Sequence, residues 1–497
     1  MRPGRLAALG AALLCAACTV GPDYQRPSAP VAAAYKEQKG WKPAAPSDAI
    51  PRGAWWAIYN DPLLDSLERQ VNVSNQTVKE YEAAYRSAVA LTHEAQGGLF
   101  PTLSVTPDVT RSNGGGVRSL GSGSSGSGFR GSSGPFTEYS LEGSASWVPD
   151  VWGRIRRQVE SQAAAAQVNA ADLANAQLSA QATLATDYFG LRYEDSLQRL
   201  LEQTVAAYRR ALQITENQYK AGTISRVDVV TAEAQLQGVV AQLAGVGVQR
   251  AQYEHAIAML IGKTPDQLSI PFSPLPNAVP VVPAGVPSTL LERRPDIAAA
   301  ERAMQEQNAL IGYNIAAFYP TISLTATGGF AGNPISGLLS VADSLWSIGA
   351  SATQNLFEGG TRTAAVQAAR ATYEQAVATY RQTVLTAFQQ VEDELAALRI
   401  LQNQAAAEDN AVHAAQRALD VVLNEYRAGT VAYTSVITQQ ETLLSDQQSA
   451  LAVQQSRFIA SVALVQALGG GWAASELPSE DSITGTPLQT LRRVATP

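Results

Sequence analysis

The sequence is poor in the residues that build disulfides, thiolate metal sites and nucleic-acid interfaces. Its 497 residues include two cysteines and three histidines, and its net charge is −7. Both cysteines, Cys15 and Cys18, lie near the N-terminus, so a chain cut before Cys18 would have no internal disulfide and no thiolate metal site. No basic stripe interrupts the acidic composition, which indicates that nucleic acid is not a partner.

The pattern of an enzyme is also missing. His93, His255 and His413 stand alone in helix-forming segments, and none has the spacing of a metal-binding pair. Neither a nucleophile elbow nor a phosphate-binding P-loop occurs. We therefore expect a protein that is not an enzyme and has no metal or cofactor. Beyond the N-terminal segment, no apolar run reaches the ~18 residues that mark a transmembrane helix.

Two very long helix-forming segments dominate what is present. Residues 154–221 and 361–428 contain no proline and only one glycine, Gly190. Each would span ~100 Å as a helix, at ~1.5 Å per residue. A compact globular domain has no use for such rods, although a coiled-coil spacer would explain them taken alone. A return helix is expected after each rod, over 224–261 and 431–468, so that each pair forms a hairpin.

The two rods belong to a tandem duplication. Each ends in a Tyr-x-Ala-Gly-Thr sequence, at 219–223 and at 426–430. The two sequences start 426 − 219 = 207 residues apart, and the same distance along the chain separates Gly153 from Gly360. Upstream of each rod, Phe100-Pro101-Thr102 matches Tyr319-Pro320-Thr321. A repeat of this length predicts two structural copies.

Four segments alternate apolar and polar residues with the period of a strand. They are 102–110, 139–147, 320–330 and 344–357. Each has about the ~9–11 residues that a tilted strand needs to cross a bilayer, and aromatic residues cluster near their ends. A soluble antiparallel sheet with one wet face would give the same alternation. The Gly/Ser-rich stretch 111–135 between the first two strands reads as an exposed loop.

Four strands cannot close a barrel, because known single-chain barrels need at least ~8 and lipid tolerates no open edge. Either the strands are soluble or several chains pool them. Three chains would supply twelve strands, and their rods could continue below as a tube. The expected fold is therefore mainly α with a small β part, in which four strands per chain contribute to a trimeric 12-stranded transmembrane β-barrel. Long coiled-coil α-hairpins would form a periplasmic α-barrel.

The N-terminus reads as a bacterial secretion signal. Two arginines precede an apolar run and small residues before Cys18. Cys18 resembles the cysteine of a lipoprotein signal, which is acylated after cleavage before it. Cys15 stands where an aliphatic residue is usual, and an ordinary signal peptide cleaved nearby is the alternative. The residue after Cys18 is Thr19 and not an aspartate. By analogy with such lipoproteins, this favours the outer membrane over the inner membrane.

The chain is expected to divide into six parts. They are a signal peptide (1–17), a lipidated extended segment (18–61), a first repeat (62–262), a Pro-rich linker (263–287), a second repeat (288–470) and a C-terminal tail (471–497). The first repeat should open with one helix over 62–96. The tandem tryptophans Trp55 and Trp56 are expected to anchor packing, and the polar tail to be poorly ordered.

Taken together, these motifs resemble the outer-membrane factor family, the TolC-like channels of tripartite pumps, and within it the lipoprotein branch of RND-type efflux systems. The motifs that carry the resemblance are residues 18–27 (CTVGPDYQRP), Trp55-Trp56 with Asp61-Pro62, Phe100-Pro101, 293–301 (RRPDIAAAE), Phe318-Tyr319-Pro320 and the two Tyr-x-Ala-Gly tips. They cover nearly the whole chain in the family's order.

The resemblance implies a homotrimer in the bacterial outer membrane, anchored by covalent lipid on Cys18 and extending into the periplasm. Its helical tips, with Gly222, Thr223, Gly429 and Thr430, would meet a periplasmic adaptor (membrane fusion) protein and, through it, an inner-membrane RND-type transporter. The channel would passively carry drugs, detergents or metal ions outward.

The resemblance also implies a gate at the tips, which usually includes an aspartate on the helix after the second tip. Thr438 stands at that position here, which puts an acidic ring in doubt. Glu441 and Asp228 are replacement candidates, because closely spaced carboxylates attract cations. For Asp228, a contact that starts a helix is the alternative.

Two other functions remain open. A channel of the same fold could serve type I peptide or protein secretion. A structural or adaptor coiled-coil lipoprotein would explain the rods, but not four strands with aromatic ends or the tandem copies.

Overall fold

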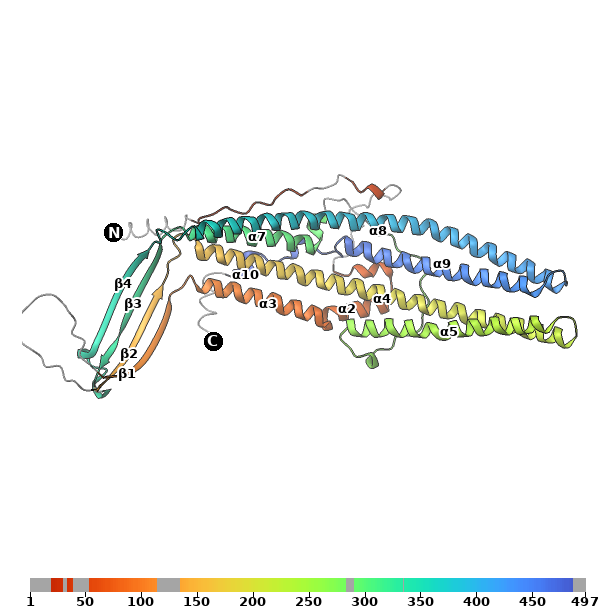
Figure 1. The fold of residues 1–497 in the computed structure, drawn as a ribbon, viewed down its shortest axis with the longest axis horizontal. Coiled ribbons are helices and arrows are strands. Elements are labelled where there is room, and N and C mark those ends of the chain that lie inside the picture. Colours follow the sequence, from red (N-terminus) through yellow and green to blue (C-terminus); the bar gives the residue numbers. More distant parts are fainter. Residues whose placement is uncertain are drawn as a thin grey trace, which may run out of the picture.

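The computed structural model describes residues 19–29, 34–38, 53–113, 135–282, 290–333 and 335–485. Long helices run side by side, and a small sheet extends from one end of the helical body (Figure 1). The prediction of a mainly helical chain with a small β part is confirmed. Among the described residues, no helix is both long and apolar enough to cross a membrane.

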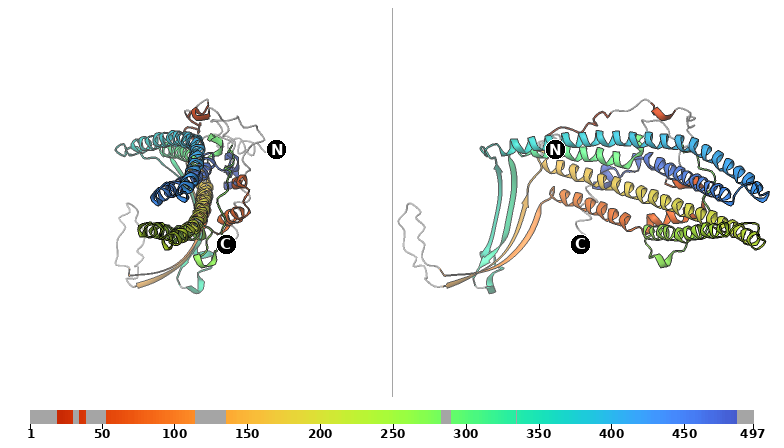
Figure 2. Two further views of the ribbon diagram at one scale, coloured as in Figure 1. Left: turned by 90° about the vertical axis from the view of Figure 1, so that its right-hand side faces the viewer. Right: turned by 45° about the vertical axis from the view of Figure 1, so that its right-hand side comes forward.

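Four helices form the two hairpins that the sequence predicts. Helices α4 (Arg154–Lys220) and α8 (Thr361–Arg427) each have 67 residues, and α5 (Arg226–Leu260) and α9 (Tyr433–Ala467) each have 35. Helix α4 packs against α5 and α9, and α8 packs against α9. The hairpins form a curved layer in the end-on view of Figure 2.

Shorter elements surround the hairpins. They are η1 (Lys36–Gln38), η3 (Trp55–Tyr59), α2 (Pro62–Ser74), α3 (Gln76–Gly97), η4 (Pro265–Gln267), α6 (Leu290–Arg293), α7 (Pro295–Ala316), η6 (Ile335–Gly337), η7 (Val341–Asp343), η8 (Ala474–Glu476) and α10 (Glu480–Thr484). Helix α7 packs beside α4 and α8, and α3 beside α4.

The prediction of one helix over 62–96 is wrong, because the helix is interrupted at Asn75. This residue ends α2 and starts α3 in an extended conformation. Its side-chain oxygen accepts from the Val78 amide at 3.1 Å, and its amide group donates to the Leu260 carbonyl at 2.8 Å. Asparagine is a favoured N-cap, and here it also satisfies a carbonyl at the end of α5.

The sheet has four antiparallel strands in sequence order. They are β1 (Thr102–Asn113), β2 (Pro135–Trp147), β3 (Thr321–Gly332) and β4 (Ser344–Thr353). All four predicted strands exist, but β4 ends before the predicted 357. Strands β1 and β2 extend into the stretch predicted as a loop, of which 114–134 lies outside the described residues.

The register gives the sheet one apolar and one polar face. One row across all four strands is Leu103, Ala145, Ala326 and Ile348. The next row is Ser104, Ser144, Thr327 and Ser347, with hydroxyl-to-hydroxyl hydrogen bonds of 2.7 Å between the first two and between the last two. Because side chains alternate along a strand, these rows lie on opposite faces.

The largest apolar core lies where both hairpins meet η3 and α2. Trp55 and Trp56 are 1% and 3% exposed, which confirms that they anchor packing. The rings of Phe189 on α4 and Phe458 on α9 stack with centroids 4.6 Å apart. Burying aromatic rings at this junction contributes much of the apolar stabilisation and holds the two hairpins together.

A buried ionic network attaches the linker to the first hairpin. Asp195 on α4 is fully buried and pairs with Arg192 at 3.1 Å and with Arg250 of α5 at 2.7 Å. It also accepts from the Ser273 amide at 3.0 Å, and Arg250 donates to the Ile270 carbonyl at 2.8 Å. The described part of the Pro-rich linker is therefore bound to the helices and is not a free spacer.

The expectation of a poorly ordered tail is wrong for residues 471–485. Helix α10 packs against α3 and α4, and its Ile483 is 3% exposed. His93 Nε2 hydrogen-bonds the Ile483 carbonyl at 2.9 Å, and Gln96 donates to the Thr484 carbonyl at 3.0 Å. Trp472 and Leu477 also pack against buried alanines of α4 and α7, so several apolar side chains dock this segment. Residues 486–497 lie outside the described part.

Asp187, midway along α4, gives a prediction about pH. Burial raises the pKa of its carboxyl to about 6. The unfolded value is about 4, so the stability that the protonated form provides is present below pH 4 and lost as pH rises through 6. At pH 8, Asp187→Asn should raise the free energy of unfolding by roughly 1–2 kcal/mol, after allowing for partial exposure of the side chain. At pH 4 the substitution should change this free energy little. Urea unfolding followed by circular dichroism at both pH values measures this. Equal effects at the two pH values would contradict it.

Candidate functional site: the tips of the two hairpins

The first tip is a glycine turn followed by a capped helix. Gly222 has a φ of +76°, a left-handed conformation that suits glycine after a helix. The Thr223 amide and hydroxyl both donate to the Gln218 carbonyl, at 3.0 and 2.9 Å. Ser225 then starts α5 in a capping box with Asp228, whose carboxylate accepts from the Ser225 amide at 3.1 Å.

The second tip repeats the turn without the capping box. Gly429 has a φ of +75°, and the Thr430 amide and hydroxyl donate to the Glu425 carbonyl at 3.0 and 2.9 Å. Ala432 occupies the N-cap of α9 and makes no side-chain cap. The two tips thus share a turn geometry, while only the first has a carboxylate fixed at its helix start.

The two tips are joined by contacts that the sequence did not reveal. The Tyr426 hydroxyl on α8 donates to Gln218 Oε1 on α4 at 2.7 Å. Within the second hairpin, the ring of Tyr426 on α8 lies 5.3 Å from that of Tyr433 on α9, which is 4% exposed. A small apolar cluster of Ala232, Leu419, Val436 and Ile437 continues this contact. The repeated Tyr219 and Tyr426 were the available signal, but both repeats carry the tyrosine and only Tyr426 forms this contact.

The three gate candidates are not bonded to one another in the described structure. Asp228 caps α5, so the helix-start contact exists whether or not Asp228 also acts in a gate. Thr438 is exposed on α9 and donates back to the Thr434 carbonyl at 3.1 Å. Glu441 is exposed one turn further along α9. Within one chain these side chains form no ring.

The carboxylates nevertheless influence the buried tyrosines. Burial raises the pKa of Tyr433 to about 12, and Tyr426, Tyr208 and Asp228 add to the increase. Burial, together with the Glu441 charge, raises the pKa of Tyr208 on α4. These tyrosines are therefore neutral near neutral pH, and acidic groups of both hairpins lie within electrostatic range of them.

The lipidation candidate Cys18 lies outside the described residues, but the segment after it is firmly bound. We call residues 19–28 the N-terminal strap. Arg157 on α4, which is 3% exposed, donates to the carbonyls of Val20 and Gly21 and pairs with Asp23 at 2.9 Å. Thr19 lies against Gly153, where α4 meets the strands. The strap therefore begins at the junction of sheet and helices.

Aromatic residues gather at the same junction. The rings of Trp152 and Tyr319 stack 4.9 Å apart, and Trp152 Nε1 donates to the Pro320 carbonyl at 2.8 Å. Phe318, which precedes Tyr319, is 42% exposed, and Phe357, which lies between β4 and α8, is 91% exposed. Exposed aromatic rings next to a sheet with an apolar face are typical of a membrane–water interface.

Metal chemistry finds no support in the described part of the chain, which holds no cluster of three potential ligands. His255 and His413 are exposed on α5 and α8, and His93 bonds the tail.

Comparisons with known proteins agree with this description. The sequence family described as "Outer membrane efflux protein" matches residues 67–263 and 286–470. The solvent efflux pump outer membrane protein SrpC of Pseudomonas putida is 32% identical over 485 residues, covering 94% of this chain and 98% of SrpC. The toluene efflux pump outer membrane protein TtgC, also of Pseudomonas putida, is 29% identical over 471 residues, covering 93% of this chain and 94% of TtgC.

A solved structure shows the same fold. The outer-membrane channel OprN superimposes with a TM-score of 0.83 at 28% sequence identity, covering 92% of this chain and all of that one.

Proposed function

Because this chain belongs to the outer membrane efflux protein family, we propose that it is the outer-membrane channel of a tripartite efflux system, a passive conduit for small toxic compounds. One observation supports this most strongly: a four-stranded sheet with two unpaired edges, one apolar face and one hydroxyl-rich face, joined to long helices. Such a sheet cannot enter lipid alone, because its edge strands would leave backbone groups unpaired.

Three copies would remove the open edges. Strand β1 of one chain would pair with β4 of the next, giving a 12-stranded barrel. The exposed Leu103, Val105, Trp346 and Ile348 would face lipid, and the serine and threonine rows would line water. The equal lengths of α4 and α8, and of α5 and α9, support a tandem duplication whose six copies surround the axis as a periplasmic tube.

Anchoring and partner contact would occur at opposite ends of this tube. Cleavage after residue 17 would make Cys18 the acylated N-terminus, and the strap would hold it beside the membrane interface. At the other end, Gly222, Thr223, Gly429 and Thr430 would contact a periplasmic adaptor and, through it, an inner-membrane transporter. A photo-crosslinking residue at Thr223 or Thr430 should capture the adaptor in cells, whereas one at Thr372, on the α8 surface away from the tips, should not.

The function is tested by combining conductance with susceptibility. Purified protein in planar bilayers should give single-channel openings, and deletion of the gene should sensitise cells to a panel of solvents, detergents and antibiotics. A protein without openings would be an adaptor or a structural lipoprotein. Loss of peptide secretion with unchanged susceptibility would indicate the secretion alternative.

The gate gives a further prediction. Replacing Asp228 and Glu441 together by alanine should raise single-channel conductance, because polar tip contacts hold the channel closed. Since Asp228 also caps α5, alanine removes a cap worth about 1 kcal/mol. The pair Asp228→Asn and Glu441→Gln removes only charge and serves as the comparison. Conductance that is unchanged in both double variants would reject these gate residues.

A further inference from the structure

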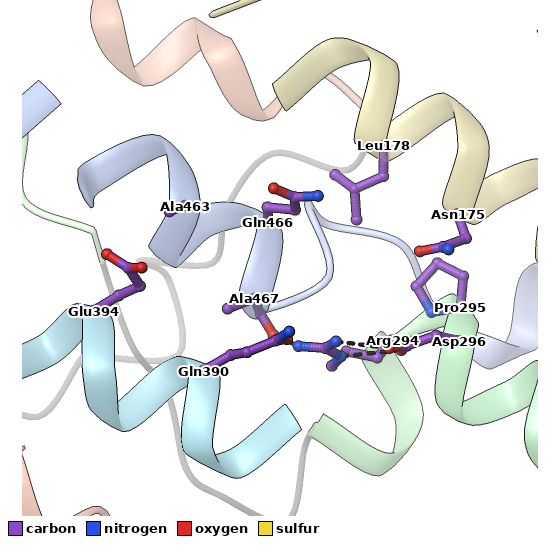
Figure 3. A pocket seen from close by; sticks show the side chains of 10 residues that line it. All are labelled: Asn175, Leu178, Arg294, Pro295, Asp296, Gln390, Glu394, Ala463, Gln466 and Ala467. Carbon is purple, nitrogen blue, oxygen red and sulfur yellow. Dashed lines mark hydrogen bonds and ion pairs between the residues drawn. The ribbon is translucent and has the colours of Figure 1, made fainter. Parts of the chain in front are cut away.

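A polar cavity of about 380 Å³ lies where α4, α7, α8 and α9 meet (Figure 3). Helix α4 contributes Asn175 and Leu178, α8 contributes Gln390 and Glu394, and α9 contributes Gln466. The start of α7 closes one side with Pro295 and Asp296, preceded by Arg294. We call this cavity the junction pocket. Its volume is in the range of sites for small organic molecules.

The charges in the junction pocket do not cancel. Arg294 donates to both carboxylate oxygens of Asp296, at 3.0 and 2.6 Å, and to the Ala467 carbonyl at 2.8 Å. The guanidinium is thereby neutralised by Asp296, as the dashed contacts in Figure 3 show. Glu394 has no ion pair or hydrogen bond among the described residues, and it is the uncompensated charge of the pocket.

Unused hydrogen-bonding groups surround that charge. The side chains of Asn175, Gln390 and Gln466 make no hydrogen bonds within the described chain. Each amide offers donors and acceptors to a ligand. Leu178 and Ala463 add apolar surface. This combination suits an organic cation with one hydrogen-bonding ammonium group and a short apolar body.

The pocket opens on the inner side of the curved helical layer. On α8, Glu392 accepts from the amides of Lys36 and Glu37 in η1, at 2.6 and 3.0 Å. Gln390 and Glu394 each lie two residues from Glu392, about 200° around the helix, and so face away from η1. In Figure 2, η1 lies on the outside of the layer formed by the hairpins. The pocket therefore faces the concave side.

We propose that the junction pocket is a binding site for small organic ammonium ions on the wall of the conduit, with Glu394 as the charged partner. This inference rests on the proposed channel function, since the concave side is then the path of the cargo. Partial burial and the neighbouring Asp393 raise the pKa of Glu394, because both disfavour its charged form. A bound ammonium would stabilise that charged form.

The test is block of single-channel current in planar bilayers by 2-phenylethylammonium. The wild-type channel should show concentration-dependent block. In Glu394→Gln, which keeps the size of the side chain, the half-blocking concentration should rise about tenfold, as expected for losing a hydrogen bond to a charged group. The matched control is Glu374→Gln, an equal charge change at an exposed position of α8 about 30 Å away.

The probe itself has a control in 2-phenylethanol, which has the same apolar body without the charge and should block equally and weakly in all variants. Equal block of wild type and Glu394→Gln by the ammonium, or no block of a conducting wild-type channel, would overturn the junction-pocket site and leave the channel function intact. A purified protein that never conducts would overturn the channel function, and this inference with it.

Discussion

Replacing Ile348 by lysine is expected to abolish assembly in the membrane, whereas lysine at the adjacent Ser347 should be tolerated. Ile348 is 79% exposed in the apolar row with Leu103, Ala145 and Ala326. A lysine on the lipid face near the middle of a barrel costs about 2–4 kcal/mol. A trimer would include three such lysines, so the cost to the whole assembly is about three times larger.

Ser347 provides the matched control because it is one residue away on the opposite face. It belongs to the hydroxyl row with Ser104, Ser144 and Thr327, which would face the water-filled interior. Membrane fractionation and heat-modifiable mobility on gels measure assembly of the two variants. If the two lysine variants assemble equally well, the sheet is not embedded in lipid in this orientation.

Replacing Asp195 by asparagine should cause the largest loss of stability in the helical body. Its carboxylate is fully buried between Arg192 and Arg250. Removing its charge leaves the buried Arg192 without an ion-pair partner, while Arg250 keeps its pair with Glu254 at 2.7 Å. Breaking a buried pair typically costs about 3–5 kcal/mol. The urea midpoint, followed by helical circular dichroism, should fall strongly. Protease cleavage in the segment 268–282 should become faster, because Asp195 also binds the Ser273 amide.

Asp393→Asn is the control for that change. Asp393 is an exposed carboxylate on α8, and among the described residues it accepts one long hydrogen bond, from Gln389 at 3.4 Å. Replacing it by asparagine should change the free energy of unfolding by less than about 0.5 kcal/mol. If the Asp195→Asn protein unfolds at the same urea concentration as the wild type, the ionic network does not hold the linker.

The elements that depend on local pattern could be predicted from the sequence. The rods follow from long runs without proline, the turns at Gly222 and Gly429 from glycine after a helix, and the strands from alternation. The break at Asn75 was missed because its cause is a hydrogen bond to Leu260, far away in the sequence. Asparagine inside a helical pattern gives only a weak local signal.

The site was less predictable than the fold for the same reason. The hydrogen bond between Tyr426 and Gln218, the Arg157 contacts with the strap and the junction pocket all join residues that are distant in the sequence. Where both repeats carry the same residue, as with Tyr219 and Tyr426, the sequence does not show which copy makes the contact. The capping role of Asp228 was the exception, since Ser225 three residues earlier is a recognisable capping signal.

The proposed pore requires that several chains pool their strands. Native mass spectrometry of the detergent-solubilised full-length protein, paired with conductance of the same preparation, tests this directly. Three chains per particle, with channel openings only in the trimer fraction, is the predicted result. A stable monomer that binds no lipid bilayer and conducts no current would contradict it.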